Sequence, residues 1–281
     1  MNYASLEAQA LEIRRDIVGM IAKAKSGHPG GSLSCTDILV SLYFGDILNC
    51  DPENPEKVDR DYFILGKGHA APALYATLAR KGYFSPEDLP TLRQVGSKLQ
   101  GHPDSNLLEG VEVSTGSLGQ GLSIACGVAC GNRLKGNSAK TFVLLGDGEC
   151  QEGQIWEAAT FGAHQKLGNL VAIVDSNGLQ IDGACSDVCE SAEIGDKFAA
   201  FGWDVTNVEG HDFESLLCGL KAAYSAEGEK PHVIIANTIK GKGVSFMENN
   251  AGWHGNAPNS EQLEIAISDL QSISNAGRSV N

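Results

Sequence analysis

Apolar and polar positions divide the chain into two alternating kinds of segment. Short apolar runs end in glycine, aspartate or asparagine, and longer stretches of helical character separate them. In the runs at 142–145 and 170–174, apolar residues occupy both parities, which is typical of strands buried on both faces. The predicted strands lie at 61–66, 140–148, 169–177, 201–210 and 231–241. The predicted helices between them lie at 152–166, 191–200 and 212–226.

This alternation predicts an α/β fold, in which a parallel β-sheet is flanked by helices on both faces. Ligands of such sheets bind beyond the carboxyl ends of the strands. Asp147, Asn177 and the Lys240-Gly241 turn fall at those ends. We therefore expect these residues to meet at one edge of the sheet.

The two ends of the chain differ from its centre. Residues 1–25 have apolar residues at helical spacing and lack a signal-peptide core. The rest of the first third is predicted to be helical, with loops rich in glycine, histidine and proline. These loops lie at 26–34, 66–75 and 100–105.

After residue 256 the pattern predicts a capped amphipathic helix and then a polar tail. We therefore divide the chain into a domain over 1–258 and a C-terminal helix and tail over 259–281. No run reaches the roughly 20 apolar residues that a membrane span needs, so we predict a cytoplasmic protein.

Composition and charge narrow the class of protein. The chain has 281 residues, of which 42% are hydrophobic and 20% charged, as in an ordinary globular protein. With 21 basic and 35 acidic residues, its net charge is −14, which argues against a nucleic-acid or anionic-membrane surface. A small anionic ligand would need local help from a metal ion or backbone N–H groups.

The eight cysteines have no C-x-x-C spacing. Cys126 and Cys130 form an i,i+4 pair in a segment of small residues that predicts a buried helix, and Cys185 and Cys189 form another. Metal sites usually pair their ligands at shorter spacing. We therefore expect reduced core cysteines.

The glycines around Asp147 do not match the common nucleotide-binding motifs. Gly146 and Gly148 would need a third glycine at 151 for the dinucleotide fingerprint, and Gln151 is there. What remains is a carboxylate at one strand end and the amide of Asn177 at the next. Oxygen ligands of this kind suit Mg²⁺, which commonly bridges a few protein oxygens to a substrate diphosphate.

The Leu179 carbonyl oxygen would add a third protein ligand, and the helix after Gln151 offers free N–H groups to a phosphate. The alternative is that both segments are simple turns, because turns use the same residue types. Taken alone, neither motif decides between these interpretations.

Four of the seven histidines adjoin a glycine in a predicted loop, where a ring can face a ligand. These are His28, His69, His102 and His254. Imidazole suits proton transfer near neutral pH. Structural roles are predicted for the other three, His164, His211 and His232.

Seven blocks, in order, resemble the motifs of the transketolase family over about residues 10–258. They read SGHPGGSLS, GKGHAAPALYA, QGHPD, STGSLGQGLSIACGVA, GDGECQEGQIWEAA, IKGKG and WHGNAP. The resemblance implies the thiamine-diphosphate-binding fold, in the domain type that binds the diphosphate. It also implies thiamine diphosphate and Mg²⁺, Ca²⁺ or Mn²⁺ as cofactors.

The resemblance assigns roles to individual residues. The implied metal ligands are Asp147, Asn177 and the carbonyl of Leu179. The implied cofactor contacts are His69, Gly116, Ser117, Leu118, Gly146, Asp147, Gly148, Glu149, Asn177, Lys240 and His254. The implied catalytic residues are His28, His102 and His254, which hold sugar hydroxyls and move protons, and Glu152, which lies in the network that couples two cofactor sites.

In this family a two-carbon ketol unit passes from a ketose phosphate to an aldose phosphate while the cofactor carries it. Full-length transketolases have roughly twice this length and continue into a domain that binds the cofactor's pyrimidine. The resemblance therefore implies the N-terminal subunit of a split transketolase, which a separately encoded C-terminal subunit completes. We expect at least a heterotetramer, with two copies of each subunit, that acts on sugar phosphates.

The sequence departs from the family in detail, and two other functions stay open. Ser117 replaces a common proline, and the GGSLS and WHGNAP blocks resemble animal-like and split types, so the acceptor sugar is open and includes sulfonated or branched sugars. An α-type subunit of a 2-oxo acid dehydrogenase has the same cofactor motif. A cofactor-binding scaffold without activity is the third possibility.

Overall fold

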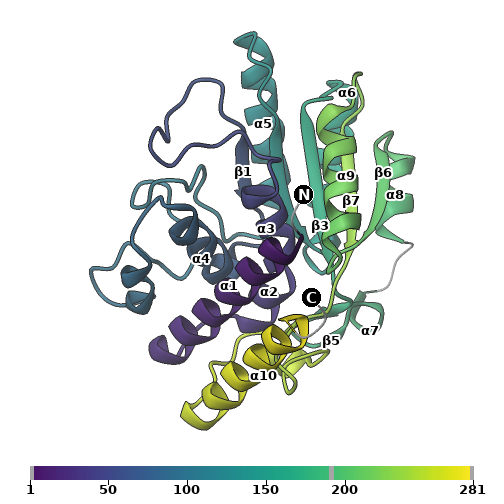
Figure 1. The fold of residues 1–281 in the computed structure, drawn as a ribbon. Helices are drawn as coiled ribbons and strands as arrows, with labels where there is room; N and C mark the ends of the chain where they lie inside the picture. The colour runs from purple at the N-terminus through teal and green to yellow at the C-terminus, as the bar shows by residue number, and fades with distance from the viewer. Residues whose placement is uncertain (1–2, 190–192, 279–281) are drawn as a thin grey trace.

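The computed structural model describes residues 3–189 and 193–278. Its centre is a parallel sheet of five strands in the order β1-β2-β3-β7-β6 (Figure 1). The strands are β1 (Tyr62–Leu65), β2 (Thr141–Gly146), β3 (Leu170–Ser176), β6 (Asp204–Glu209) and β7 (His232–Asn237). Each lies within one of the predicted runs, so the predicted parallel sheet is confirmed.

Helices pack on both faces of the sheet. One face meets α5 (Gln120–Leu134), α6 (Gly153–His164) and α8 (Ile194–Ala200), and the other meets α1 (Tyr3–Ala24), α3 (Thr36–Phe44), α4 (Ala71–Lys81) and α9 (Phe213–Ser225). The helix predicted at 191–200 corresponds to α8, which begins at Ile194; residues 191 and 192 lie outside the described residues.

The strand register explains why the central strands are apolar at every position. Leu144, Ile173 and Ile234 lie side by side across β2, β3 and β7, and their side chains join the core beneath α1, α3 and α9. The neighbouring row faces α5, α6 and α8. Burying a leucine or isoleucine fully stabilises a fold by about 1.5–3 kcal/mol, so both rows hold the sheet between its helices.

The first third contains more helix than the sequence predicts. Residues 26–34 and 66–75 are predicted as loops, but α2 covers Pro29–Ser34 and α4 begins at Ala71. Glycine disfavours helices, yet Gly30 and Gly31 lie inside α2. A Cβ on Gly30 would lie 2.9 Å from the Trp253 carbonyl oxygen. The close packing that these glycines permit outweighs their low helix propensity.

The remaining elements are short, apart from the last helix. They are β4 (Leu179–Gln180), β5 (Gly183–Ala184), α7 (Cys185–Cys189) and the 3₁₀ turns Gly68–Ala70, Pro86–Thr91, Glu149–Gln151 and Ala251–Trp253. The predicted capped helix is α10 (Ser260–Arg278), which packs along α1 (Figure 1). Its cap is reciprocal, because Asn259 and Gln262 each donate a backbone N–H to the other's side chain.

The division of the chain at residue 258 stays a prediction, and the end of the predicted tail, 279–281, lies outside the described residues. None of the helices in residues 3–189 and 193–278 combines the length and apolar character that a bilayer span requires.

All eight cysteines are free thiols, but the prediction of core positions holds for only three of them. Cys35, Cys126 and Cys150 are buried, whereas Cys189 and Cys218 are exposed. The predicted small-residue helix is α5, and it is buried along one face only: Cys126 is buried, while Gly127 is exposed. Because successive residues of a helix point in different directions, one face of α5 is buried and the opposite face is exposed, although its residues are mostly small.

Candidate active site

Four strands deliver the predicted site residues to one edge of the sheet. Asp147 follows β2, Asn177 follows β3, Lys240 lies just beyond β7, and His69 lies just beyond β1. Parallel strands end at the same edge, which brings residues far apart in sequence together. Hydrogen bonds join the segments at this edge.

The three predicted metal ligands lie close together. Asp147 is 7% exposed, and its Oδ1 and Oδ2 accept hydrogen bonds from the backbone N–H of Gly148 at 2.8 Å and of Gly178 at 2.5 Å. The side-chain oxygen of Asn177 accepts from the Leu179 N–H at 3.2 Å. Asp147 is therefore fastened to the turn that carries the other two ligands.

The chemistry of these groups fits a divalent cation. Burial, and next the neighbouring Asp175 carboxylate, raise the pKa of Asp147, so a nearby cation would stabilise its ionised form. The Leu179 carbonyl already accepts a hydrogen bond from the Lys240 ammonium at 2.9 Å, so this oxygen faces positive charge. Carboxylate, amide and carbonyl oxygens are a donor set suited to Mg²⁺.

Lys240 is a buried lysine at this edge, close to a second one, Lys67. It is 2% exposed, and burial, followed by the charge of Lys67, lowers its pKa to about 8. Its ammonium contacts the Leu179 carbonyl and, at 3.1 Å, Nδ1 of His254. Neither is a carboxylate, so a phosphate oxygen would be a stronger partner for this ammonium than those it has.

Three of the predicted loop histidines form a triangle. The ring centroids of His28, His69 and His254 are 5.1–5.4 Å apart. Their segments lie at the start of α2, beyond β1 and after the Ala251–Trp253 turn, so the fold gathers rings from distant parts of the chain. The triangle adjoins Lys240 through His254.

The fourth ring, His102, lies beside the segment 116–118, which the resemblance assigns to the cofactor. Gly116 has φ +145°, and a Cβ there would lie 2.9 Å from Cγ of His102. Gly116 therefore allows this loop to pass against the imidazole. Ser117 and Leu118 follow in the same loop before α5 begins; Ser117 is exposed and Leu118 is half-buried.

The histidines of the triangle are expected to stay uncharged down to acidic pH. Burial is the largest cause that lowers the pKa of His28 and His254, each to about 4, and that of His69 well below its usual value. A depressed pKa in the folded state means that their contribution to stability is complete above about pH 6.5 and is lost as the pH falls through 4.

In an NMR titration of the ¹³C-labelled chain, we expect His28 and His254 to titrate near pH 4, because their rings are buried among positive groups. The same chain unfolded in urea is the control, with midpoints near about 6.5. Midpoints at or above that value in the folded chain would contradict the expectation.

The two glutamates of the GDGECQEG block have different surroundings. Glu149 is 3% exposed, and its carboxylate accepts the backbone N–H groups of Gly119 and Gly146, each at 3.0 Å. Burial raises its pKa to about 7. Glu149 thus ties the end of β2 to the start of α5, and its contact with the cofactor stays a prediction.

Glu152, in contrast, is exposed at the N-terminus of α6. This position leaves its carboxylate open to a second chain. Its proposed part in a network between two sites stays a prediction.

Gly148 packs closely against Gln180. A Cβ added to Gly148 would lie 3.0 Å from the Cβ of Gln180, so the absence of a side chain here lets the GDG turn approach β4 closely.

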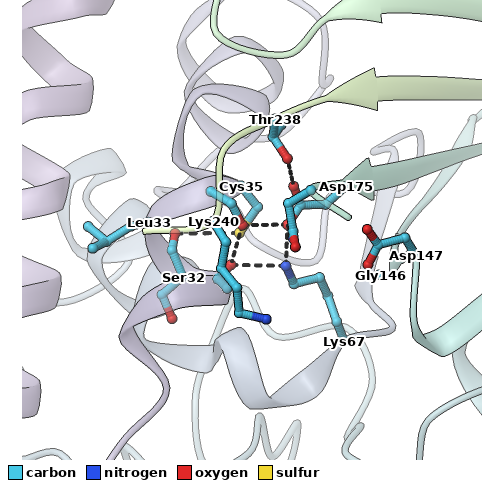
Figure 2. A network of polar contacts seen from close by, with 12 residues as sticks. Ser32, Leu33, Cys35, Lys67, Gly146, Asp147, Asp175, Thr238 and Lys240 are labelled. Atoms are coloured by element: carbon cyan, nitrogen blue, oxygen red, sulfur yellow. Dashed lines mark hydrogen bonds and ion pairs between the residues drawn. The ribbon is translucent and has the colours of Figure 1, made fainter. Parts of the chain in front are cut away.

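A buried ion pair beneath the site is absent from the residues predicted from sequence. Asp175, at the end of β3, is 0% exposed and pairs with the Lys67 ammonium. Figure 2 shows Asp175 between Lys67 and Thr238, with Asp147 beside it. Ser34 also donates to Asp175, at 2.6 Å. The sequence signal that could have indicated this pair is a lysine next to a glycine at the end of one predicted strand and an aspartate next to a serine at the end of another.

Arg93 is a second residue that sequence reasoning missed. Its guanidinium donates to Ser26 Oγ at 2.7 Å and contacts His28 Nδ1 at 3.3 Å. It also lowers the pKa of both His28 and His102, after burial. Arg93 has φ +58°, and no motif around it indicates a site.

The histidines predicted to be structural lie where the sequence places them. His164 ends α6, His232 begins β7, and His211 lies in the turn after β6. His211 is bound to Asp37 at 2.7 Å and to the backbone of Ile239 at 2.8 Å. It therefore contacts the segment that carries Lys240.

Comparisons with known proteins show the family of the chain. The family described as "Transketolase, thiamine diphosphate binding domain" matches residues 7–270. The chain is 44% identical to an apulose-4-phosphate transketolase subunit of Phocaeicola vulgatus, covering 96% of this chain and 95% of that protein. It is 41% identical to the 6-deoxy-6-sulfo-D-fructose transketolase subunit SqwG of Clostridium sp., covering 95% and 96%.

Among solved structures, the transketolase of Campylobacter jejuni superposes with a TM-score of 0.89 at 35% identity. The match covers 96% of this chain but 43% of that one, so the chain spans less than half the length of this enzyme. With the fold, the strand-end site and these matches in agreement, the chain belongs to the transketolase family of transferases and corresponds to its thiamine diphosphate binding domain.

Proposed function

We propose that this chain is the diphosphate-binding subunit of a two-component transketolase. With a separately encoded C-terminal subunit, it transfers a two-carbon ketol unit from a ketose phosphate to an aldose phosphate. The observation that carries the proposal is the match to relatives that are named as transketolase subunits, over 95% and 96% of their lengths. In this proposal the second half of the site lies on the other subunit.

The residues at the strand ends supply one wall of that site. Asp147, Asn177 and the Leu179 carbonyl hold Mg²⁺, for which Ca²⁺ or Mn²⁺ can substitute. Lys240, His69 and the Gly148 backbone bind the diphosphate, and Gly116 to Leu118 lie against the cofactor rings. The geometry that supports this is the fastening of Asp147 to the turn at Gly178, beside the buried Lys240 ammonium.

The cofactor, when bound, supplies the nucleophilic carbon and the electron sink for the cleavage of a carbon–carbon bond. The chain binds and orients the sugar and handles protons. The rings of His28, His102 and His254 accept hydrogen bonds from sugar hydroxyls, and a neutral imidazole can take up the proton of the hydroxyl next to the bond that breaks. The lowered pKa values keep these rings neutral at pH 7.

The donor or acceptor is proposed to be a branched or sulfonated sugar or a related sugar phosphate. Two relatives that match nearly the whole chain are named for apulose 4-phosphate and for 6-deoxy-6-sulfo-D-fructose. Arg93 and Lys240 are the positive groups next to the histidines, and the specificity for the far end of the sugar is shared with the partner subunit.

A reconstitution experiment tests the proposal. The purified chain is expected to bind thiamine diphosphate weakly and to show no turnover, because half of the site is missing. Mixed with the partner subunit, Mg²⁺, thiamine diphosphate and an aldose phosphate acceptor, it is expected to transfer the two-carbon unit from a ketose donor such as fructose 6-phosphate, 6-deoxy-6-sulfo-D-fructose or apulose 4-phosphate. The acceptor then becomes a longer ketose, and the donor is left as a shorter aldose.

Decarboxylation of 2-oxo acids by the same mixture serves as the contrasting assay. Decarboxylation without ketol transfer would favour a 2-oxo acid dehydrogenase subunit, and efficient ketol transfer by the chain alone would contradict the split site. Sedimentation of the mixture, with a heterotetramer expected, tests the assembly.

A further inference from the structure

The segment that carries Lys240 is a tight turn after β7. Gly241 has φ +79°, and a Cβ there would collide with the Met247 carbonyl oxygen. The Gly241 N–H donates to the Gly30 carbonyl at 3.0 Å, and the Lys240 carbonyl accepts the N–H of Asn249 at 2.9 Å. The backbone around Lys240 is therefore held on several sides, and its exact path decides where the ammonium points.

Two polar residues from other elements also contact this turn, and a third joins them to each other. Arg14 of α1 and Asp37 of α3 are 5% and 4% exposed and form a bidentate ion pair with N–O distances of 2.9 and 2.8 Å. His211, from the turn after β6, places its Nδ1 2.7 Å from Asp37 Oδ2. We call Arg14, Asp37 and His211 the loop clamp.

The hydrogen bonds of the loop clamp run in one direction. The Ile239 N–H donates to Nε2 of His211 at 2.8 Å, so Nε2 carries no proton. The ring proton is then on Nδ1, which donates to Asp37. Burial alone would raise the pKa of Asp37, but Arg14 and His211 lower it to about 2, so its carboxylate stays ionised and fixes this tautomer.

The loop clamp holds the turn at both of its ends. His211 binds the backbone N–H of Ile239, directly before Lys240, and Arg14 Nε donates to the carbonyl of Lys242, two residues after it, at 3.1 Å. Only Lys240 and Gly241 lie between these two points. Two anchors this close to Lys240 leave its backbone little freedom to move.

We propose that the loop clamp is a positioning element that sets the affinity of the site for a diphosphate ester through Lys240. Its residues touch neither the proposed metal ligands nor the site histidines in any contact described above, and they act through the backbone of Ile239 and Lys242. The proposal deepens the proposed function and rests on it, because Lys240 is there assigned to the diphosphate. His211 thereby has a role beyond the structural one that its sequence context predicts.

Two matched substitutions separate positioning from a purely structural role. His211→Gln can keep an acceptor near the position of Nε2 for the Ile239 N–H, while it loses the donor to Asp37. His211→Asn can keep a donor near the position of Nδ1 for Asp37, while it loses the acceptor for Ile239. Positioning predicts that the asparagine variant is impaired more; a role limited to neutralising Asp37 predicts that the glutamine variant is.

Two readouts are measured on the full chain with Mg²⁺. Calorimetry gives the dissociation constant for thiamine diphosphate, and hydrogen exchange gives the protection of the peptide 238–243. His211→Asn is expected to weaken binding by roughly tenfold, the size of one lost buried hydrogen bond, and to reduce the protection. His211→Gln is expected to stay within about threefold of the wild type. The control is His232→Asn, at the opposite end of β7, which should change neither.

The possible failures are distinct. Reduced protection of 238–243 with unchanged cofactor affinity in His211→Asn would overturn the loop clamp as a positioning element, and so would a glutamine variant weaker than the asparagine variant. A wild-type chain that binds no thiamine diphosphate, alone or with the partner subunit, would overturn the proposed function instead. Hydrogen exchange needs no cofactor, so it still shows whether His211 holds the turn.

Discussion

Replacing Asp147 by asparagine is expected to lower ketol transfer by the reconstituted enzyme on the order of a thousandfold, which corresponds to about 4 kcal/mol of lost stabilisation. The carboxylate accepts two backbone N–H groups and is proposed to bind the metal with its remaining lone pairs. An asparagine has one neutral oxygen for these tasks. Its NH₂ group must also face the N–H of Gly148 or Gly178, which is repulsive.

The measurement is turnover with saturating donor, together with calorimetry of thiamine diphosphate binding in the presence and absence of Mg²⁺. The matched control is Asp182→Asn, an aspartate in the turn between β4 and β5, which should leave both unchanged. Thermal unfolding of each variant shows whether a loss of activity comes from misfolding. If Asp147→Asn kept Mg²⁺-dependent binding near the wild-type value, Asp147 would not be a metal ligand.

Replacing Lys67 by methionine is expected to reduce the free energy of unfolding by about 3–5 kcal/mol, the usual cost of leaving one partner of a buried ion pair uncompensated. Lys67 and Asp175 are 2% and 0% exposed. Methionine fills a similar volume, so the loss comes mainly from the charge. Asp175 would keep its hydrogen bonds from Ser34 and Thr238 but would lose the ammonium with which it is paired.

Urea unfolding followed at several pH values tests this expectation. In the wild type the pKa of Asp175 is lowered, because the charge and hydrogen bond of Lys67 oppose burial, so the pair contributes stability above about pH 4 that is lost in acid. Without Lys67, burial raises this pKa. The difference between variant and wild type should therefore widen as the pH rises from about 4 to 7.

The control for this variant is Lys230→Met, because Lys230 forms an exposed ion pair with Asp204 at 3.2 Å. Exposed pairs contribute about 0–1 kcal/mol. A loss in Lys67→Met no larger than in this control, or one independent of pH, would show that the buried pair is not what stabilises this edge of the sheet.

The sheet could be predicted because its strands are buried on both faces. In β2 and β3 no polar residue interrupts the runs at 142–145 and 170–174, so the sequence predicts both the strands and their burial. The helix α2 could not be predicted in the same way. Its glycines carry no helical signal, and the contact that rewards them, the Trp253 carbonyl near Gly30, is over 200 residues away in sequence.

The candidate site was predictable where its residues form local motifs. Asp147 lies between two glycines at a strand end, and the loop histidines adjoin glycines, so each can be recognised from its immediate neighbours in the sequence. Lys67, Asp175 and Arg93 were missed because their importance depends on partners brought by the fold. A lysine within GKGHA reads as an exposed charge until the structure buries it against the end of β3.

The strand order has a consequence for synthesis of the chain. β7 lies between β3 and β6, although it is the last strand in sequence, so the Lys240 turn reaches Leu179 only after some 60 further residues have been made. The ribosome must therefore synthesise most of the domain before the edge of the sheet that carries the site is complete. During translation, one side of β3 stays unpaired until β7 has been made. Binding of a diphosphate can stabilise the domain only after β7 has paired with β3.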